Sequence, residues 1–159
     1  MNIYLAGPDV FRPDAADWAA EARRLVASFG HSALLPTDNE APDAPGIFAG
    51  NMALLRRADA VLANLEPFRG GEPDSGTCVE VGCAIALGKP VVGYLRDTRP
   101  LVERLGATRR PGSGDAFVDE RGWTVENFGL PLNLMLAVPC TVVEGGLAEA
   151  LARLQRDAG

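Results

Sequence analysis

Five short runs of aliphatic residues recur along the chain, and longer stretches separate them. The runs cover residues 3–6, 33–36, 60–65, 90–95 and 141–143. A short segment that is apolar almost throughout is typical of a strand covered on both faces, as in a parallel sheet. The pattern therefore predicts an α/β fold in which helices lie on both sides of a parallel sheet.

The stretches between these runs have the spacing of amphipathic helices. In the first, apolar residues from Trp18 to Phe29 recur at intervals of three and four, Pro13 suits the first turn, and Gly30 follows the last. The other predicted helices cover residues 47–57, 77–87 and 147–156. This order predicts a doubly wound parallel sheet in three α/β/α layers, of flavodoxin-like size. With 159 residues, we expect a single domain over residues 1–159.

A long polar stretch, residues 97–129, lies between the fourth and fifth predicted strands and has no clear periodicity. Loops of this length without secondary structure are uncommon in compact domains and are often lids, binding loops or oligomer contacts. A mobile surface loop is the equally weighted alternative.

Charge and cysteine content exclude several classes of function. The net charge is −6, with 15 Lys and Arg against 21 Asp and Glu, so we expect no nucleic acid partner. No apolar run is long enough to span a membrane, and no leader-like segment precedes the first strand, which predicts a cytoplasmic protein. Three scattered cysteines and one histidine, His31, predict neither a disulfide framework nor a metal site. Carboxylates must therefore carry most of the chemistry.

Carboxylates and aromatic residues follow the predicted strands. In open α/β sheets the ligand crevice lies beyond the carboxyl ends of the strands. We therefore expect Asp38, Asp74 and Glu80 to converge on one pocket, with Tyr4 and Phe11 nearby. Two or more carboxylates around an apolar cleft suit acid–base or nucleophilic work on a glycosidic bond.

Glu80 has two interpretations. Residues 77–80 (TCVE) match the S/T-x-x-E capping box, in which the glutamate bonds the start of a helix. The other interpretation is a nucleophile. Gly70, Gly71 and Gly76 allow close contact between the backbone and a ligand. A carboxylate in the first turn of a helix also stays ionised, which a nucleophile requires. Both interpretations stay open on the pattern alone.

Two asparagines and the helix start at residues 75–77 are further candidates. Asn51 is expected early in the second helix as a solvent-facing, capping or binding residue. Asn133 lies inside an apolar run, where it is either a buried turn residue or a contact to a ligand or a neighbouring subunit. Glycine-rich motifs for nucleoside triphosphates and dinucleotides are missing, although residues 75–77 would suit a lone phosphate.

Taken together, several segments resemble the nucleoside 2-deoxyribosyltransferase family. The segments are 3–8 (IYLAGP) with Phe11, 36–41 (PTDNEA), 58–61 (ADAV), 67–70 (PFRG), 72–77 (EPDSGT), 80–84 (EVGCA) and 128–136. The resemblance implies a flavodoxin-like fold, exchange of the base on a 2′-deoxynucleoside for a free nucleobase, and a role in nucleotide salvage. It also implies a covalent glutamyl–sugar intermediate, net retention and no cofactor.

The resemblance assigns roles to individual residues. Glu80 matches the nucleophile, Asp74 the carboxylate that positions the sugar hydroxyls, and Tyr4 the tyrosine that orients the nucleophile. The matched substrate-binding positions are Gly7, Phe11, Asp38, Asn39, Asn51, Gly76, Asn133 and Met135.

The residue at position 51 is aspartate in some members of the family, so Asn51 leaves the proton donor to the base open. Asp38 is the remaining candidate for that acid. Asn133 and Met135 match residues that reach a neighbouring subunit's site, which implies a homodimer or hexamer.

Two other functions remain as alternatives. A hydrolase of nucleoside 5′-monophosphates on the same fold would need a phosphate-binding cluster, for which Arg69 and the pair Arg109 and Arg110 are candidates. A flavodoxin-like binding or signalling module would need a phosphate-binding loop after the first strand, or an aspartate after the third strand with a distant lysine. The sequence offers neither.

Overall fold

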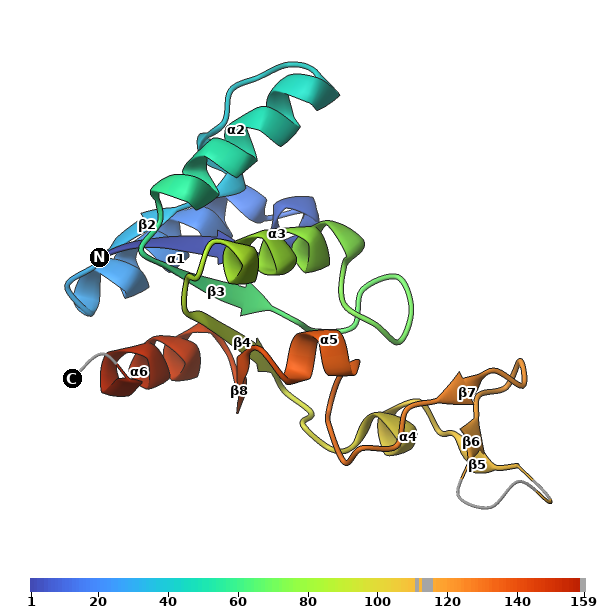
Figure 1. Cartoon of the computed structure of the whole chain (residues 1–159). Helices are drawn as coiled ribbons and strands as arrows, with labels where there is room; N and C mark the ends of the chain where they lie inside the picture. The colour runs from blue at the N-terminus through green and yellow to red at the C-terminus, as the bar shows by residue number, and fades with distance from the viewer. Residues whose placement is uncertain (111, 113–115, 158–159) are drawn as a thin grey trace.

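The computed structural model describes residues 1–110, 112 and 116–157, and its centre is a five-stranded parallel sheet (Figure 1). In spatial order the strands are β2 (Ser32–Leu34), β1 (Asn2–Ala6), β3 (Ala60–Asn64), β4 (Val91–Leu95) and β8 (Thr141–Glu144). The predicted doubly wound α/β fold is therefore confirmed. The order places β1 and β3 in the middle, where ligand crevices form in such sheets.

Helices cover both faces of the sheet because its strands are apolar on both sides. Ile3 and Leu5 of β1 pack with α1 (Ala15–Ser28) and α6 (Leu147–Asp157). Tyr4 and Ala6 point to the opposite face, where they share a core with α2 (Ala44–Arg57) and α3 (Ser75–Ala86). The alternation of side chains along a strand thus directs Tyr4 toward α3.

Helix ends follow local chemistry, with one correction. Gly30 and Gly88 adopt the left-handed backbone expected just after α1 and α3, with φ of 79° and 68°. The capping-box interpretation of residues 77–80 is wrong. Asp74 caps α3 instead, because its carboxylate accepts a hydrogen bond from the Thr77 amide, and this frees Glu80 for another role.

The stretch at residues 97–129, expected to lack regular structure, folds into short elements that we call the arm. They are α4 (Leu101–Arg104) and the antiparallel strands β5 (Thr108–Arg109), β6 (Phe117–Val118) and β7 (Thr124–Val125). A small apolar cluster of Leu101, Val102 and Val125 holds them together. Figure 1 shows this small sheet projecting away from the central one. Pro111 and residues 113–115 of the arm lie outside the described residues.

Three short helical segments complete the path near the site. They are η1 (Pro8–Phe11) after β1, η2 (Pro36–Asp38) after β2, and α5 (Leu134–Ala137) between the arm and β8. Among the described residues, no helix combines the length and the apolar character needed to cross a membrane.

Candidate active site

Tyr4 and Glu80 form a buried pair at the contact between β1 and α3. The Tyr4 hydroxyl donates a hydrogen bond of 2.6 Å to Oε1 of Glu80. Tyr4 is fully buried and Glu80 is 9% exposed, so water competes little for this bond. The two residues are 76 positions apart in the sequence, and the direction of Tyr4 on β1 brings them together.

Burial sets the protonation of this pair. It raises the pKa of Glu80 from 4.5 to about 7, with a smaller rise from the negative charge of Asp74, while the hydrogen bond from Tyr4 lowers it. Burial and the neighbouring Glu80 raise the pKa of Tyr4 well above its ordinary value. Tyr4 therefore keeps its proton near neutral pH and acts as a donor, while Glu80 is close to half ionised at pH 7.

Asp74 stands six residues before Glu80 and begins α3. One oxygen, Oδ2, accepts hydrogen bonds from the backbone amide of Thr77 at 3.0 Å and from its hydroxyl at 3.2 Å. A β-carbon on Gly76 would lie 3.0 Å from that oxygen, so glycine leaves the capping carboxylate its position. The carboxylate of Asp74 is thereby fixed at the helix start, and its other oxygen, Oδ1, has no bond to a described residue.

Gly7 and Phe11 lie where β1 passes into η1. A β-carbon on Gly7 would come within 2.8 Å of the Asn64 β-carbon and 2.9 Å of the Asp9 carboxylate, so the close approach of β1 and β3 requires glycine. Phe11 is 57% exposed and stacks on Phe68 with ring centroids 5.6 Å apart. An exposed aromatic face therefore stands at the carboxyl end of β1.

Asp38 and Asn39, at the end of β2, make bonds within the chain. Asp38 forms an ion pair with Arg23 and accepts a hydrogen bond from the Leu35 amide at 2.9 Å. Asn39 donates to the carbonyls of Gly46 and Ile47, which ties η2 to the first turn of α2. These bonds give both residues a structural role, and their contact with a base stays a prediction.

Asn51 lies in the second half of α2 rather than early in the helix, because α2 begins at Ala44. Its Oδ1 atom is buried and has no hydrogen-bond partner among the described residues. Buried amide oxygens normally have a partner, so this acceptor is suited to a donor from a ligand.

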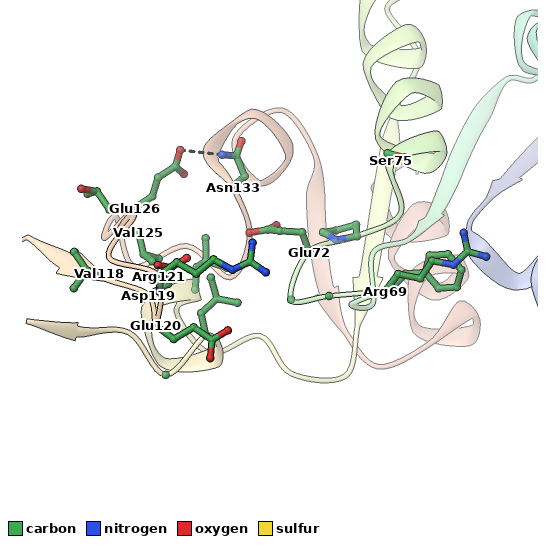
Figure 2. Close-up of a pocket in the computed structure, with 18 of the residues that line it drawn as sticks. Arg69, Glu72, Ser75, Val118, Asp119, Glu120, Arg121, Val125, Glu126 and Asn133 are labelled. Atoms are coloured by element: carbon green, nitrogen blue, oxygen red, sulfur yellow. Dashed lines mark hydrogen bonds between the residues drawn. The ribbon is translucent and has the colours of Figure 1, made fainter.

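Asn133 and Met135 lie at the start of α5. Asn133 accepts a hydrogen bond from the Met135 amide and donates one of 2.9 Å to Glu126, which is drawn as a dashed line in Figure 2. Met135 is 72% exposed and Val138, next to α5, is 70% exposed. A cavity of about 530 Å³ lies against both α3 and α5, and its lining includes Cys78 and Gly82.

A larger open cavity of about 1160 Å³ lies between the loop that precedes α3 and the arm (Figure 2). Asp74 and Asn133 line it, together with Glu72, Glu126 and Arg121. Tyr4 and Glu80 are not part of its lining, so the buried pair is not open to this cavity. Burial raises the pKa of Glu72 above its ordinary value, while the positive charge of Arg104 lowers it and the negative charge of Glu126 adds a smaller rise.

Sequence reasoning missed three contacts near the site. Phe68 supplies the second ring of the aromatic stack, Asp9 is buried and accepts a hydrogen bond from Asn64, and Glu126 orients Asn133. A signal for Phe68 was available, because it follows a buried strand. No group of three metal-ligating side chains occurs in the part of the chain that the structure describes.

Fold and site define an α/β protein with a buried carboxylate–phenol pair between the central strand β1 and α3. The nucleoside 2-deoxyribosyltransferase family model matches residues 3–135. The chain is 40% identical to a 2-desoxiribosyltransferase from Leishmania mexicana, with a TM-score of 0.83 over 98% of this chain and 97% of that one. The chain therefore belongs to the nucleoside 2-deoxyribosyltransferase family, which is a family of enzymes.

Two further similarities are more limited. A conserved protein from Enterococcus faecalis V583 shares the fold, with 21% identity and a TM-score of 0.62 over 97% of this chain and 98% of that one. An uncharacterized protein of Schizosaccharomyces pombe is 34% identical over 125 residues, which are 72% of this chain. The match spans 59% of the length of that curated relative.

Proposed function

We propose that this protein transfers the 2-deoxyribosyl group between nucleobases, so that the base of a 2′-deoxynucleoside is exchanged for a free base. The observation that carries the proposal is the buried Tyr4–Glu80 pair, in a chain closely similar to a 2-desoxiribosyltransferase. Such exchange fits a role in nucleoside salvage in the cytoplasm, and the proposed chemistry requires no cofactor.

In the first step Glu80 is the nucleophile. One of its oxygens forms a bond to C1′ of the sugar while the bond from C1′ to the base nitrogen breaks. The base leaves with the electron pair of that bond and takes up a proton from solvent. Tyr4 holds Oε1 at 2.6 Å, and no described residue bonds Oε2, so Oε2 is the oxygen available for attack. The negative charge of Glu80 also stabilises the positive charge that develops on the sugar.

In the second step a nitrogen of the incoming base attacks C1′ on the same face that the first base left, and the proton of that base is released to solvent. The ester bond to Glu80 breaks and the carboxylate is restored, so two inversions give net retention. Only the ionised form of Glu80 attacks, so the first step accelerates as the pH rises through about 7.

The neighbouring residues have binding roles in this proposal. Asp74, fixed as the cap of α3, accepts hydrogen bonds from the sugar hydroxyls through Oδ1, and Gly76 permits its position. Phe11 forms an aromatic wall for the base, and the buried Oδ1 of Asn51 accepts a donor from it. The ion pair of Asp38 with Arg23 disfavours Asp38 as the acid that protonates the leaving base.

The proposed enzyme is a homo-oligomer, a homodimer or a hexamer, in which Asn133 and Met135 reach a neighbouring site. Support comes from the exposed apolar side chains Met135, Val138 and Phe128, which lie in one short segment. Exposed apolar groups of this size are typical of association surfaces. Light scattering of the native protein and of Met135→Glu tests this point, and we expect the substitution to shift the protein toward the monomer.

The decisive experiment incubates the protein with 2′-deoxyinosine and adenine and separates the products by chromatography. We expect 2′-deoxyadenosine to form, to be lost in Glu80→Ala, and to persist in Glu103→Ala, which removes an exposed carboxylate from α4. Free hypoxanthine without 2′-deoxyadenosine would contradict transfer and identify water as the acceptor. Faster cleavage of 2′-deoxyinosine 5′-monophosphate would instead favour the hydrolase alternative, which the carboxylates Glu72, Asp74 and Glu126 around the open cavity disfavour.

A further inference from the structure

An arginine lies over two stacked aromatic rings beside the proposed base site. The guanidinium carbon of Arg69 is 4.7 Å from the ring centre of Phe68 and 5.3 Å from that of Phe11. The two rings are themselves nearly parallel, at 15°. These contacts hold the cation by its attraction to the ring faces and leave the edge of the guanidinium plane free to donate hydrogen bonds.

The donors of Arg69 bond no residue that the structure describes. Among the residues that the structure describes, no carboxylate or carbonyl bonds this guanidinium, whereas neighbouring Arg12 is bonded twice by Asp14. The backbone of Arg69 is also unusual, because it is the only described non-glycine residue with a positive φ, at 54°. Residues other than glycine rarely adopt this backbone conformation, and those that do cluster at ligand sites.

The position of Arg69 connects it to the reacting pair. Phe11 follows Tyr4 by seven residues, at the carboxyl end of β1, and Arg69 follows β3, which is the strand paired with β1. Figure 2 shows the Arg69 side chain directed away from Glu72 and toward the first segment of the chain. The cation thus stands on the Phe11–Phe68 stack, at the edge of the open cavity that Asp74 also lines.

We propose that Arg69 determines which bases the site accepts, by donating hydrogen bonds to a ring nitrogen and a carbonyl oxygen of a 6-oxopurine. This inference rests on the proposed function and extends it to the choice of base. A guanidinium fork matches the adjacent acceptors O6 and N7 of hypoxanthine or guanine. Adenine presents an amino donor at the same position, and two donors repel each other there. The site should therefore favour 6-oxopurines over adenine as the leaving base.

The test compares Arg69→Met with the native protein on two donors, 2′-deoxyinosine and 2′-deoxyadenosine, with one common acceptor base. In a two-step exchange, kcat/KM for the donor reports only the first half-reaction, so the acceptor does not affect the comparison. We expect the ratio of kcat/KM for 2′-deoxyinosine to that for 2′-deoxyadenosine to fall about tenfold or more, as for loss of a bidentate contact to a base. Arg69→Lys, which keeps the charge but loses the fork, should lower the ratio as well.

Arg12→Met is the matched control, because it removes a positive charge from the residue that follows Phe11, and Asp14 already occupies the donors of Arg12. Its ratio should stay that of the native protein. An equal loss on both donors in Arg69→Met would overturn the proposal and indicate a purely structural role. A selective loss on 2′-deoxyinosine 5′-monophosphate would also overturn it, by assigning the guanidinium to phosphate.

Calorimetry with free hypoxanthine and free adenine separates this proposal from the proposed function. If the native protein releases no base from either donor, the transferase proposal fails, but the two binding constants still test Arg69. Weaker binding of hypoxanthine alone in Arg69→Met would support the role in base choice. Unchanged binding of both bases would refute it.

Discussion

Removing the Tyr4 hydroxyl tests whether this residue controls the ionisation of Glu80. In Tyr4→Phe the carboxylate loses the hydrogen bond that lowers its pKa, while burial and Asp74 continue to raise it. A hydrogen bond to a charged group contributes about 1.5–3 kcal/mol, and one pKa unit corresponds to about 1.4 kcal/mol. We therefore expect the pKa of Glu80 to rise by about one to two units, from about 7 to roughly 8–9.

This shift has a specific kinetic signature. At pH 7 the ionised fraction of Glu80 would fall from about one half to roughly 1–10%, which lowers the rate of the first step about 5- to 50-fold. Above pH 9 most of the rate should return, because the carboxylate is again ionised. The assay is kcat/KM for 2′-deoxyinosine between pH 5.5 and 10, with release of hypoxanthine as the readout.

Tyr94→Phe is the matched control. Tyr94 is also a buried tyrosine on a central strand, but it belongs to the opposite core, with α1 and α6. Its loss should leave the acid limb of the profile in place. If Tyr4→Phe keeps the native acid limb, or lowers the rate equally at every pH, Tyr4 does not act through the ionisation of Glu80 and the reasoning is refuted.

Three further substitutions test the same site. Glu80→Gln removes a buried carboxylate whose pKa in the folded state exceeds its ordinary value of 4.5. The free energy of unfolding in urea at pH 8 should therefore be about 2–3 kcal/mol higher than in the native protein. This gain should vanish below about pH 4.5, where the carboxyl group is protonated in both the folded and the unfolded state. Asp74→Asn keeps an oxygen to cap α3 but removes the negative charge that raises the pKa of Glu80. Thermal stability should therefore change little, while the acid limb of the pH profile of kcat/KM moves to lower pH. A limb that moves to higher pH would contradict the effect of Asp74 on the pKa of Glu80. In Gly50→Ala the new β-carbon would lie about 2.2 Å from the side-chain amide of Asn39, which bonds the first turn of α2. We therefore expect the free energy of unfolding in urea to fall by about 1–3 kcal/mol. Unchanged stability would show that Asn39 does not anchor α2.

Much of the fold could be predicted because its signals are local. The apolar strands and the glycines that end α1 and α3 depend on residues within one element, and the structure confirms them. The arm could not be predicted in the same way. Its strands are two residues long, which is too short for any periodicity, and the cluster of Leu101 and Val125 that holds them joins residues 24 positions apart.

Several contacts of the site could not be predicted from local sequence patterns either. The pattern at residues 77–80 suits a capping box, but Asp74 lies earlier and its carboxylate already bonds the Thr77 amide, so local competition decided the cap. The bond between Tyr4 and Glu80 spans 76 positions. The order of the predicted strands placed the two residues near each other, and the resemblance to a family suggested that Tyr4 orients Glu80. Arg69 was considered for phosphate, whereas its position on two phenyl rings depends on the register between β1 and β3, which no local pattern contains.

The proposed transfer reaction requires that water be kept from the glycosyl intermediate, because water would otherwise compete with the second base. Within one chain, burial protects Glu80 itself, but the cavity beside Asp74 is open toward the arm. In the proposed oligomer, Asn133 and Met135 of a neighbouring copy would close it, and Met135 leaves 72% of its surface exposed in one chain. An apolar side chain this exposed is better explained by contact with a second copy of the chain than by solvent alone. Oligomer formation and the choice of a base over water as acceptor would then have one structural cause, and a monomeric Met135→Glu protein should release more free sugar per exchange than the native enzyme does.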